Sequence, residues 1–167
     1  MFIIPVFLFF LLSDVVGEYS RYIALFIFIV ASITDWLDGY LARKYKSVTN
    51  FGKFMDPLAD KVLVCSALIA LIETGDIASV AVIVIIAREF IITGFRLVAS
   101  DNGVVIAASK WGKLKTVSQM IMVMYLILGL YGGFFDTIAT ALVVIAVAFT
   151  IISAVDYIVK NFDVLKV

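Results

Sequence analysis

Long apolar runs alternate with short polar or glycine-containing breaks along the whole chain, which has 167 residues. An α-helix needs about 20 predominantly apolar residues to cross a hydrocarbon layer roughly 30 Å thick, and most of these runs approach that length. Each run is expected to be helical, because backbone groups in hydrocarbon have no partners other than one another. The pattern therefore predicts six transmembrane helices. Their expected ranges are 2–16, 21–43, 56–73, 77–99, 113–131 and 137–159.

The composition agrees with this pattern. Hydrophobic residues make up 64% of the chain, whereas ordinary soluble domains are about 45–50% apolar. We therefore expect an all-α integral membrane protein. Six spans with short connections use the whole length, so residues 1–167 are expected to form a single six-helix membrane domain. The formal net charge is zero, so the charge balance itself indicates no partner, and no nucleic-acid partner is expected.

Lysine and arginine are unevenly distributed between the breaks. Most of them fall in or beside the breaks after the second, fourth and sixth runs, whereas the other breaks hold mainly acids and Arg21. Because basic residues favour the cytoplasmic side of a membrane, both termini are expected to face the cytoplasm. The first run is short and has no basic flank, so the first helix is expected to be truncated at its start. The residues on the basic side are Arg43, Lys44, Lys46, Lys53, Lys61, Arg96, Lys110, Lys113, Lys115, Lys160 and Lys166.

Four aspartates interrupt the second and third runs. Asp35 and Asp38 are three positions apart, which places them on one helical face. Asp56 and Asp60 are four positions apart and share a face in the same way. Each carboxylate inside a span costs roughly 2.5–3.5 kcal/mol, and four together repel one another, so a compensating charge is expected.

Divalent cations are the simplest compensation for this cluster. The chain has no histidine, which removes the usual nitrogen ligand and the usual general base. Oxygen-only ligation suits Mg²⁺ or Mn²⁺. Four carboxylates balance two such ions, and a bridged pair of metals is a known clamp for phosphoryl displacement. The cluster therefore indicates chemistry on phosphates.

Small residues accompany the aspartates and leave room for a ligand or a neighbouring backbone. Gly39 and Ala42 follow the first pair, and Gly52 precedes the second. Pro57 directly follows Asp56 and leaves two readings open. Either Pro57 is the first helical residue and Asp56 caps it, or the helix begins near residues 49–50 and Pro57 kinks it.

Together these residues resemble the signature of the CDP-alcohol phosphotransferases, which move a phosphatidyl or similar group from a cytidine diphosphate donor to an alcohol. The resemblance implies six transmembrane helices, a homodimer and a site near the cytoplasmic face. It implies that the four aspartates hold two divalent cations and that Asp60 also takes the proton from the attacking hydroxyl. Gly39, Ala42, Arg43 and Gly52 would border the cytidine diphosphate. The signature reads Asp35-x2-Asp38-Gly39-x2-Ala42-Arg43-x8-Gly52-x3-Asp56-x3-Asp60.

A second set of charges is suited to an anionic acceptor. Arg88, Arg96, Lys113 and Lys115 form a cationic set, and both guanidinium and ammonium groups bind phosphate. Lys113 and Lys115 are expected in the loop formed by residues 110–116. Glu89 is not expected to share the helical face of Arg88, because successive residues diverge around a helix. For Arg88 a structural ion pair with an acid on another helix is the alternative. For Lys110 a role in topology is preferred.

The segments Arg88-Glu89-Phe90 and Gly112-Lys113-x-Lys115-Thr116 resemble those of family members that use sn-glycerol 3-phosphate. This resemblance implies CDP-diacylglycerol as donor, with phosphatidylglycerophosphate and CMP as products, made at the cytoplasmic side of a bacterial membrane among its lipids. It also implies an amphipathic helix at the start of relatives, and the given sequence is expected to begin after the position of that helix. Another acceptor, such as inositol phosphate, is the nearest alternative. A divalent-cation channel or transporter is the alternative from another class, because intramembrane aspartates also mark ion pathways.

Overall fold

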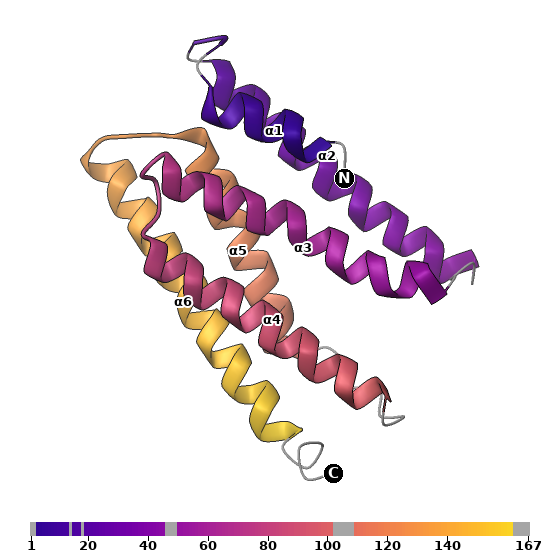
Figure 1. The fold of residues 1–167 in the computed structure, drawn as a ribbon. Coiled ribbons are helices and arrows are strands. Elements are labelled where there is room, and N and C mark those ends of the chain that lie inside the picture. The colour runs from indigo at the N-terminus through magenta and orange to yellow at the C-terminus, as the bar shows by residue number, and fades with distance from the viewer. Residues whose placement is uncertain (1–2, 14, 18, 46–49, 102–108, 162–167) are drawn as a thin grey trace. The chain divides into compact units, whose positions relative to one another are not determined.

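The computed structural model describes the backbone of residues 3–13, 15–17, 19–45, 50–101 and 109–161, with the side chains in these ranges except those of residues 36, 38–45, 50–60 and 100–101. Every regular element in the described ranges is an α-helix, so the predicted all-α class is confirmed (Figure 1). The helices are α1 (Ile3–Leu12), α2 (Tyr19–Tyr45), α3 (Asn50–Glu73), α4 (Ser79–Asp101), α5 (Lys110–Leu128) and α6 (Gly133–Lys160).

Six helices appear in this part of the chain, as many as the apolar pattern predicts. By length and composition alone, α6 is long and apolar enough to cross a membrane. The first helix is shorter than expected, because α1 has 10 residues and ends at Leu12 instead of continuing to residue 16. Gly17 lies in the turn between α1 and α2 and has a φ of 61°, a left-handed conformation that glycine adopts readily.

The start of α3 decides between the two readings of Pro57. The expected start at residue 56 is wrong, because α3 begins at Asn50 and Pro57 lies inside it. Asp56 is therefore not the N-cap of this helix. Asp56 lies within α3, four residues before Asp60, so the backbone positions of Asp56 and Asp60 are on one face of this helix.

Glycines set three of the other helix ends. After α3, Gly75 has a φ of 78°, its N–H donates to Ile72 O, and the N–H of Asp76 donates to Leu71 O. This pair of bonds is a Schellman motif, which ends a helix by turning the chain through a left-handed residue. The expected span 113–131 is wrong at its C-terminal end for a similar reason, because Gly129 has a φ of 60° and α5 ends before it. Gly132 has a φ of 121° and precedes α6.

The chain divides into two compact units, and the first contains residues 1–76 and 123–130. In this unit α1 packs against α2 and α3, and α2 packs against α3 (Figure 1). Phe7 of α1 contacts Phe28 of α2 with ring centroids 5.7 Å apart, and both side chains are fully buried. Ala24 on α2 and Ala67 on α3 are also fully buried, and such small side chains allow helix backbones to approach closely.

An ion pair joins three segments of the same unit. The Arg21 guanidinium donates to Asp76 Oδ2 at 3.0 Å and to the carbonyl oxygen of Leu126 at 3.4 Å. Thr74 Oγ1 also donates to Asp76 Oδ2, at 2.6 Å. Arg21 at the start of α2 therefore connects the turn after α3 with the end of α5. Arg21, the cation in the otherwise mainly acidic breaks, thus neutralises the carboxylate of Asp76.

The second unit contains residues 77–122 and 131–167, and in it α4 packs against α6. The packed face of α6 carries Ala146, Thr150 and Ser153, which are buried. Both hydroxyls donate to carbonyl oxygens of their own helix, at 2.7 Å from Thr150 to Ala146 and 3.0 Å from Ser153 to Thr150. Small side chains whose polar atoms are satisfied within the helix permit close packing in an apolar surrounding.

Candidate functional site

The backbone of α2 and α3 carries all four signature aspartates. Asp35 and Asp38 lie three apart in α2, and Asp56 and Asp60 lie four apart in α3, a helix that packs against α2. The Asp35 side chain is exposed. The other three side chains are outside the described residues, and no group of three metal-binding side chains occurs among those that are described. The metal cluster therefore stays a prediction.

The residues expected to border the cytidine diphosphate also lie on these two helices. Gly39, Ala42 and Arg43 occupy the last two turns of α2, and Gly52 is in the first turn of α3. Their side-chain environments fall outside the described residues, as do the contacts of the segment between the helices. Their role in donor binding stays a prediction as well.

The basic segment 110–116 is helical, so the prediction that it forms a loop is wrong. The helix α5 begins at Lys110, and Ser109 precedes it as a cap. Ser109 Oγ accepts the N–H of Gly112 at 3.1 Å, and the carbonyl oxygen of Ser109 accepts the N–H of Lys113 at 3.2 Å. A serine at this position satisfies N–H groups that the first helical turn otherwise leaves unpaired. The sequence signal was Ser109 itself, directly before the basic residues.

The helical geometry separates Lys113 from Lys115. Residues two apart point to nearly opposite sides of a helix, because each residue turns it by about 100°. Lys115 is 3% exposed, whereas Lys113 is exposed. Only Lys115 is therefore brought into the interior of the second unit.

Lys115 meets Arg88 at a single carboxylate oxygen, Glu89 Oε1. Arg88 Nη1 donates to this oxygen at 3.0 Å, and Lys115 Nζ donates to the same atom from α5. The side chains of Arg88, Glu89 and Lys115 are 12%, 17% and 4% exposed. Glu89 was not expected to share the helical face of Arg88, yet the two side chains form an ion pair. Both side chains are long enough to curl around the helix, although their Cβ atoms diverge.

Arg88, Glu89 and Lys115 are referred to below as the triad. Two buried polar atoms, one on Arg88 and one on Gln119, have no hydrogen-bond partner among the described residues. Arg88 Nε is buried without a hydrogen bond, and so is Oε1 of Gln119, one helical turn after Lys115. Gly112 is close as well, because a Cβ built on it would lie 3.8 Å from Arg88 Nη2. Buried polar atoms are usually hydrogen-bonded, so each unpaired one asks for an explanation. Sequence reasoning missed Glu89 and Gln119, although an amide four residues after Lys115 in an apolar run was a usable signal.

Arg96 is not part of this triad among the described contacts. Its Nε donates to Tyr157 Oη at 3.2 Å, and its guanidinium carbon lies 5.5 Å from the centroid of the Tyr157 ring. Phe95 contacts the same ring edge-on, with centroids 5.7 Å apart. Arg96 as a whole is exposed, although it makes these contacts with Tyr157.

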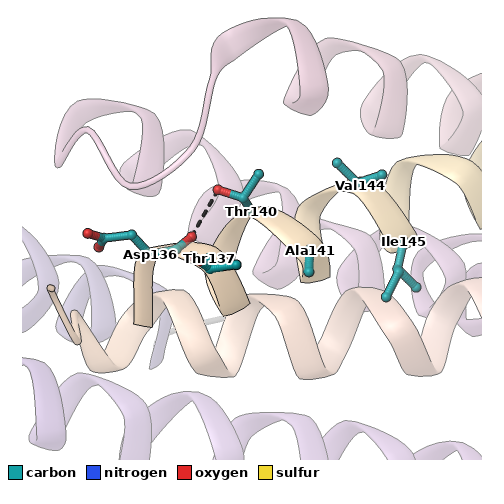
Figure 2. A pocket seen from close by; sticks show the side chains of 6 residues that line it. All are labelled: Asp136, Thr137, Thr140, Ala141, Val144 and Ile145. Carbon is teal, nitrogen blue, oxygen red and sulfur yellow. Dashed lines mark hydrogen bonds between the residues drawn. The ribbon is translucent and has the colours of Figure 1, made fainter. Parts of the chain in front are cut away.

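An open hollow lies along the N-terminal half of α6, and Figure 2 shows its lining. Its one titratable group is Asp136, whose carbonyl oxygen accepts the hydroxyl of Thr140 at 2.9 Å. The hollow contains no predicted site residue and no group suited to phosphate chemistry, so we assign no catalytic role to it. Its lining residues are Asp136, Thr137, Thr140, Ala141, Val144 and Ile145.

Comparison with known proteins identifies the class to which these features belong. Residues 1–152 match the model of the family described as CDP-alcohol phosphatidyltransferase. This match includes all the signature residues and the triad of Arg88, Glu89 and Lys115. The chain belongs to this family, and it is therefore an enzyme, a phosphatidyltransferase. The channel or transporter alternative is excluded by this membership.

Bacterial relatives with a more specific name are similar over most of the chain. The chain is 49% identical over 144 residues to the CDP-diacylglycerol–glycerol-3-phosphate 3-phosphatidyltransferase of Bacillus subtilis, a match that covers 84% of this chain and 74% of that protein. The enzyme of the same name from Haemophilus influenzae is 42% identical over 144 residues, covering 84% and 77%. That of Rickettsia typhi is 38% identical over 158 residues, covering 93% and 88%.

Proposed function

We propose that this protein transfers the phosphatidyl group of CDP-diacylglycerol to sn-glycerol 3-phosphate, giving phosphatidylglycerophosphate and CMP. The observation that carries the proposal is the family match over residues 1–152 together with relatives that bear this activity in their name. The buried Lys115 and the part-buried Arg88, which share one carboxylate oxygen, add support for an acceptor that carries a phosphate. Inositol phosphate shares that phosphate and is the closest alternative acceptor.

The oxygen ligands that the four aspartates of the signature offer are suited to divalent metal ions. Four carboxylates on two packed helices, with no histidine in the chain, offer the hard oxygen ligands that Mg²⁺ or Mn²⁺ prefers. Asp35, Asp38, Asp56 and Asp60 would hold two such ions. When bound, these ions supply charge neutralisation for the pyrophosphate and for the departing CMP.

The chain's own residues would carry the remaining steps. Asp60 accepts the proton of the acceptor hydroxyl, whose oxygen forms a bond to the phosphatidyl phosphorus as the bond to the CMP oxygen breaks. A positioned carboxylate base typically contributes 10²- to 10⁴-fold, an order-of-magnitude range. Gly39, Ala42, Arg43 and Gly52 border the nucleotide. Arg88, Arg96, Lys113 and Lys115 attract the acceptor phosphate, and no covalent enzyme intermediate forms.

The proposed setting is a bacterial cytoplasmic membrane. The six helices span it as one domain with both termini and the active site at the cytoplasmic side, and two copies of the chain form a homodimer. Support comes from the apolar surface, because all six helices carry large hydrophobic side chains that are exposed. Soluble proteins rarely expose apolar surface on this scale, whereas contact with lipid makes it favourable.

An acceptor panel in detergent micelles tests the reaction. Purified protein with CDP-diacylglycerol is expected to release CMP with sn-glycerol 3-phosphate, and to release little with inositol phosphate, serine or glycerol. Chelation by EDTA should stop the release, and added Mg²⁺ or Mn²⁺ should restore it. Faster CMP release with inositol phosphate would contradict the proposed acceptor. Full activity in EDTA would contradict the role of the aspartates as metal ligands.

A further inference from the structure

We propose that Glu89 is a positioning residue, which holds Arg88 and Lys115 together as one receptor for the phosphate group of the acceptor. This inference rests on the proposed function, because it concerns the same acceptor. Glu89 itself would not contact the substrate. Its carboxylate would fix where two cations from different helices stand before the substrate arrives.

The first argument is the geometry of the shared oxygen. Arg88 and Glu89 are neighbours on α4, whereas Lys115 comes from α5, and both cations donate to Glu89 Oε1. Each of the three side chains is less than one-fifth exposed. One carboxylate oxygen thus joins two helices and brings a guanidinium and an ammonium group within reach of each other.

The second argument is the balance of charge. Two cations this close repel each other strongly where water is scarce, and a carboxylate between them removes most of that repulsion. With Glu89 the triad keeps one net positive charge. It is therefore stable before an anion binds and still attractive to a phosphate. Without the carboxylate, the two cations are expected to move apart or turn toward water.

The third argument is the unused hydrogen-bonding capacity of Arg88. Its Nη1 is taken by Glu89, but its Nε is buried and has no partner among the described residues. The Nε and Nη2 groups form one edge of the guanidinium fork, the geometry that binds two oxygens of a phosphate. Nη2 lies near Gly112, because a Cβ built on this residue would be in ordinary contact with Nη2, at 3.8 Å. A phosphate group would satisfy the buried Nε.

Steady-state kinetics of three variants tests the inference against a purely structural ion pair. Glu89→Gln keeps the shape and removes the charge. It should raise the KM for sn-glycerol 3-phosphate roughly 10- to 100-fold, the range for a lost hydrogen bond to a charged group. The kcat and the KM for CDP-diacylglycerol should stay within about threefold, because the donor site is untouched. Glu89→Asp keeps the charge on a shorter arm and should raise the acceptor KM less.

Asp156→Asn is the matched control. Asp156 is 14% exposed, belongs to the same unit and forms an ion pair with Lys160 at 2.6 Å, but neither residue contacts the triad in the described contacts. This variant should leave all three kinetic constants unchanged. A double variant adds a second readout, because Glu89→Gln should raise the acceptor KM little further once Lys115→Met has removed one member of the pair.

The inference is overturned if Glu89→Gln leaves the acceptor KM unchanged, or if it shifts kcat and both KM values together. It is also overturned if Asp156→Asn raises the acceptor KM as much. If Glu89→Gln does not fold, Glu89→Asp decides alone, and an unchanged acceptor KM in that variant is the contrary result. The wild-type enzyme separates the two proposals. Failure to use sn-glycerol 3-phosphate at all contradicts the proposed function, whereas normal wild-type turnover with unaffected variants contradicts only the role of Glu89.

Discussion

Lys113 and Lys115 stand two positions apart in α5, and that spacing gives them different surroundings. Lys115 is buried and reaches the part-buried carboxylate of Glu89, whereas Lys113 is exposed. An exposed ammonium group is well hydrated and gains only about 0–1 kcal/mol from a charged partner. A buried and preoriented cation loses less on binding a phosphate. At the scale of single residues, burial therefore ranks the four acceptor candidates, which composition alone treats as equal.

Arg88→Ala should raise the KM for sn-glycerol 3-phosphate by roughly 10- to 100-fold, because a charge-assisted hydrogen bond to phosphate is lost. Lys113→Ala should raise it by no more than about fivefold, since that side chain is exposed. Lys110→Ala is the control and should leave it unchanged. Initial rates of CMP release at varied acceptor concentration measure all three. Equal effects of Lys113→Ala and Arg88→Ala would argue against ranking by burial.

Asp60→Asn should reduce kcat by at least about 10²-fold, because a neutral amide does not accept the proton of the attacking hydroxyl. Donor binding should persist in part, since three carboxylates remain to hold metal. CMP release measures the first effect, and equilibrium binding of labelled CDP-diacylglycerol measures the second. Asp136→Asn, which changes an acid remote in sequence from the signature, serves as control. A near-normal kcat in Asp60→Asn would exclude this residue as the base.

At the scale of helices, the ends are set by glycine turns and capping side chains. The turn at Gly75 directs Asp76 to Arg21, and the turn at Gly129 ends α5 beside the same guanidinium. A Cβ at Gly129 would overlap the Arg21 side chain, and the φ of 60° there is unfavourable for any residue with a Cβ. The helix ends and the ion pair are therefore mutually dependent.

Gly129→Ala should destabilise the protein by about 1–2 kcal/mol, the cost of a left-handed conformation for a residue with a side chain. Arg21 would also have to move away from Leu126. Gly133→Ala is the matched control, because Gly133 is helical and no atom lies within 4 Å of its built Cβ. It should be neutral or slightly stabilising. Thermal unfolding in micelles compares the two, and equal melting temperatures would contradict the conformational argument.

At the scale of the whole molecule, the distribution of charged residues along the chain predicts how the helices are oriented in the membrane. Most basic residues lie in or beside the breaks after the second, fourth and sixth apolar runs, whereas Asp76 follows α3 and Asp136 lies in the first turn of α6. Arg21, the cation of the other breaks, is engaged by Asp76. The aspartate signature and the triad both lie on helices whose basic ends are expected to face the cytoplasm. The soluble acceptor and the departing CMP would then share that compartment.

Cysteine labelling tests the proposed topology. In a Cys65→Ala background, Lys113→Cys should react with a membrane-impermeant maleimide only in inside-out vesicles. Asp136→Cys should react only in right-side-out cells, because one span is expected between the two positions. The background protein without either cysteine should remain unlabelled. Labelling of both positions from the same side would contradict the six-span arrangement.

Sequence alone determined the helical class, the family, the identity of the aspartate signature and the number of helices in the part of the chain that the structure describes. Those properties depend on apolar run length and on residue spacing, which are local. Sequence did not give the pairing of Arg88 and Lys115 at Glu89, the opposite exposures of Lys113 and Lys115, or the contact of Arg21 with Asp76. Each of these joins residues through the packing or the ending of helices. A side chain's reach and burial depend on neighbours distant in sequence, so only the tertiary structure decided them.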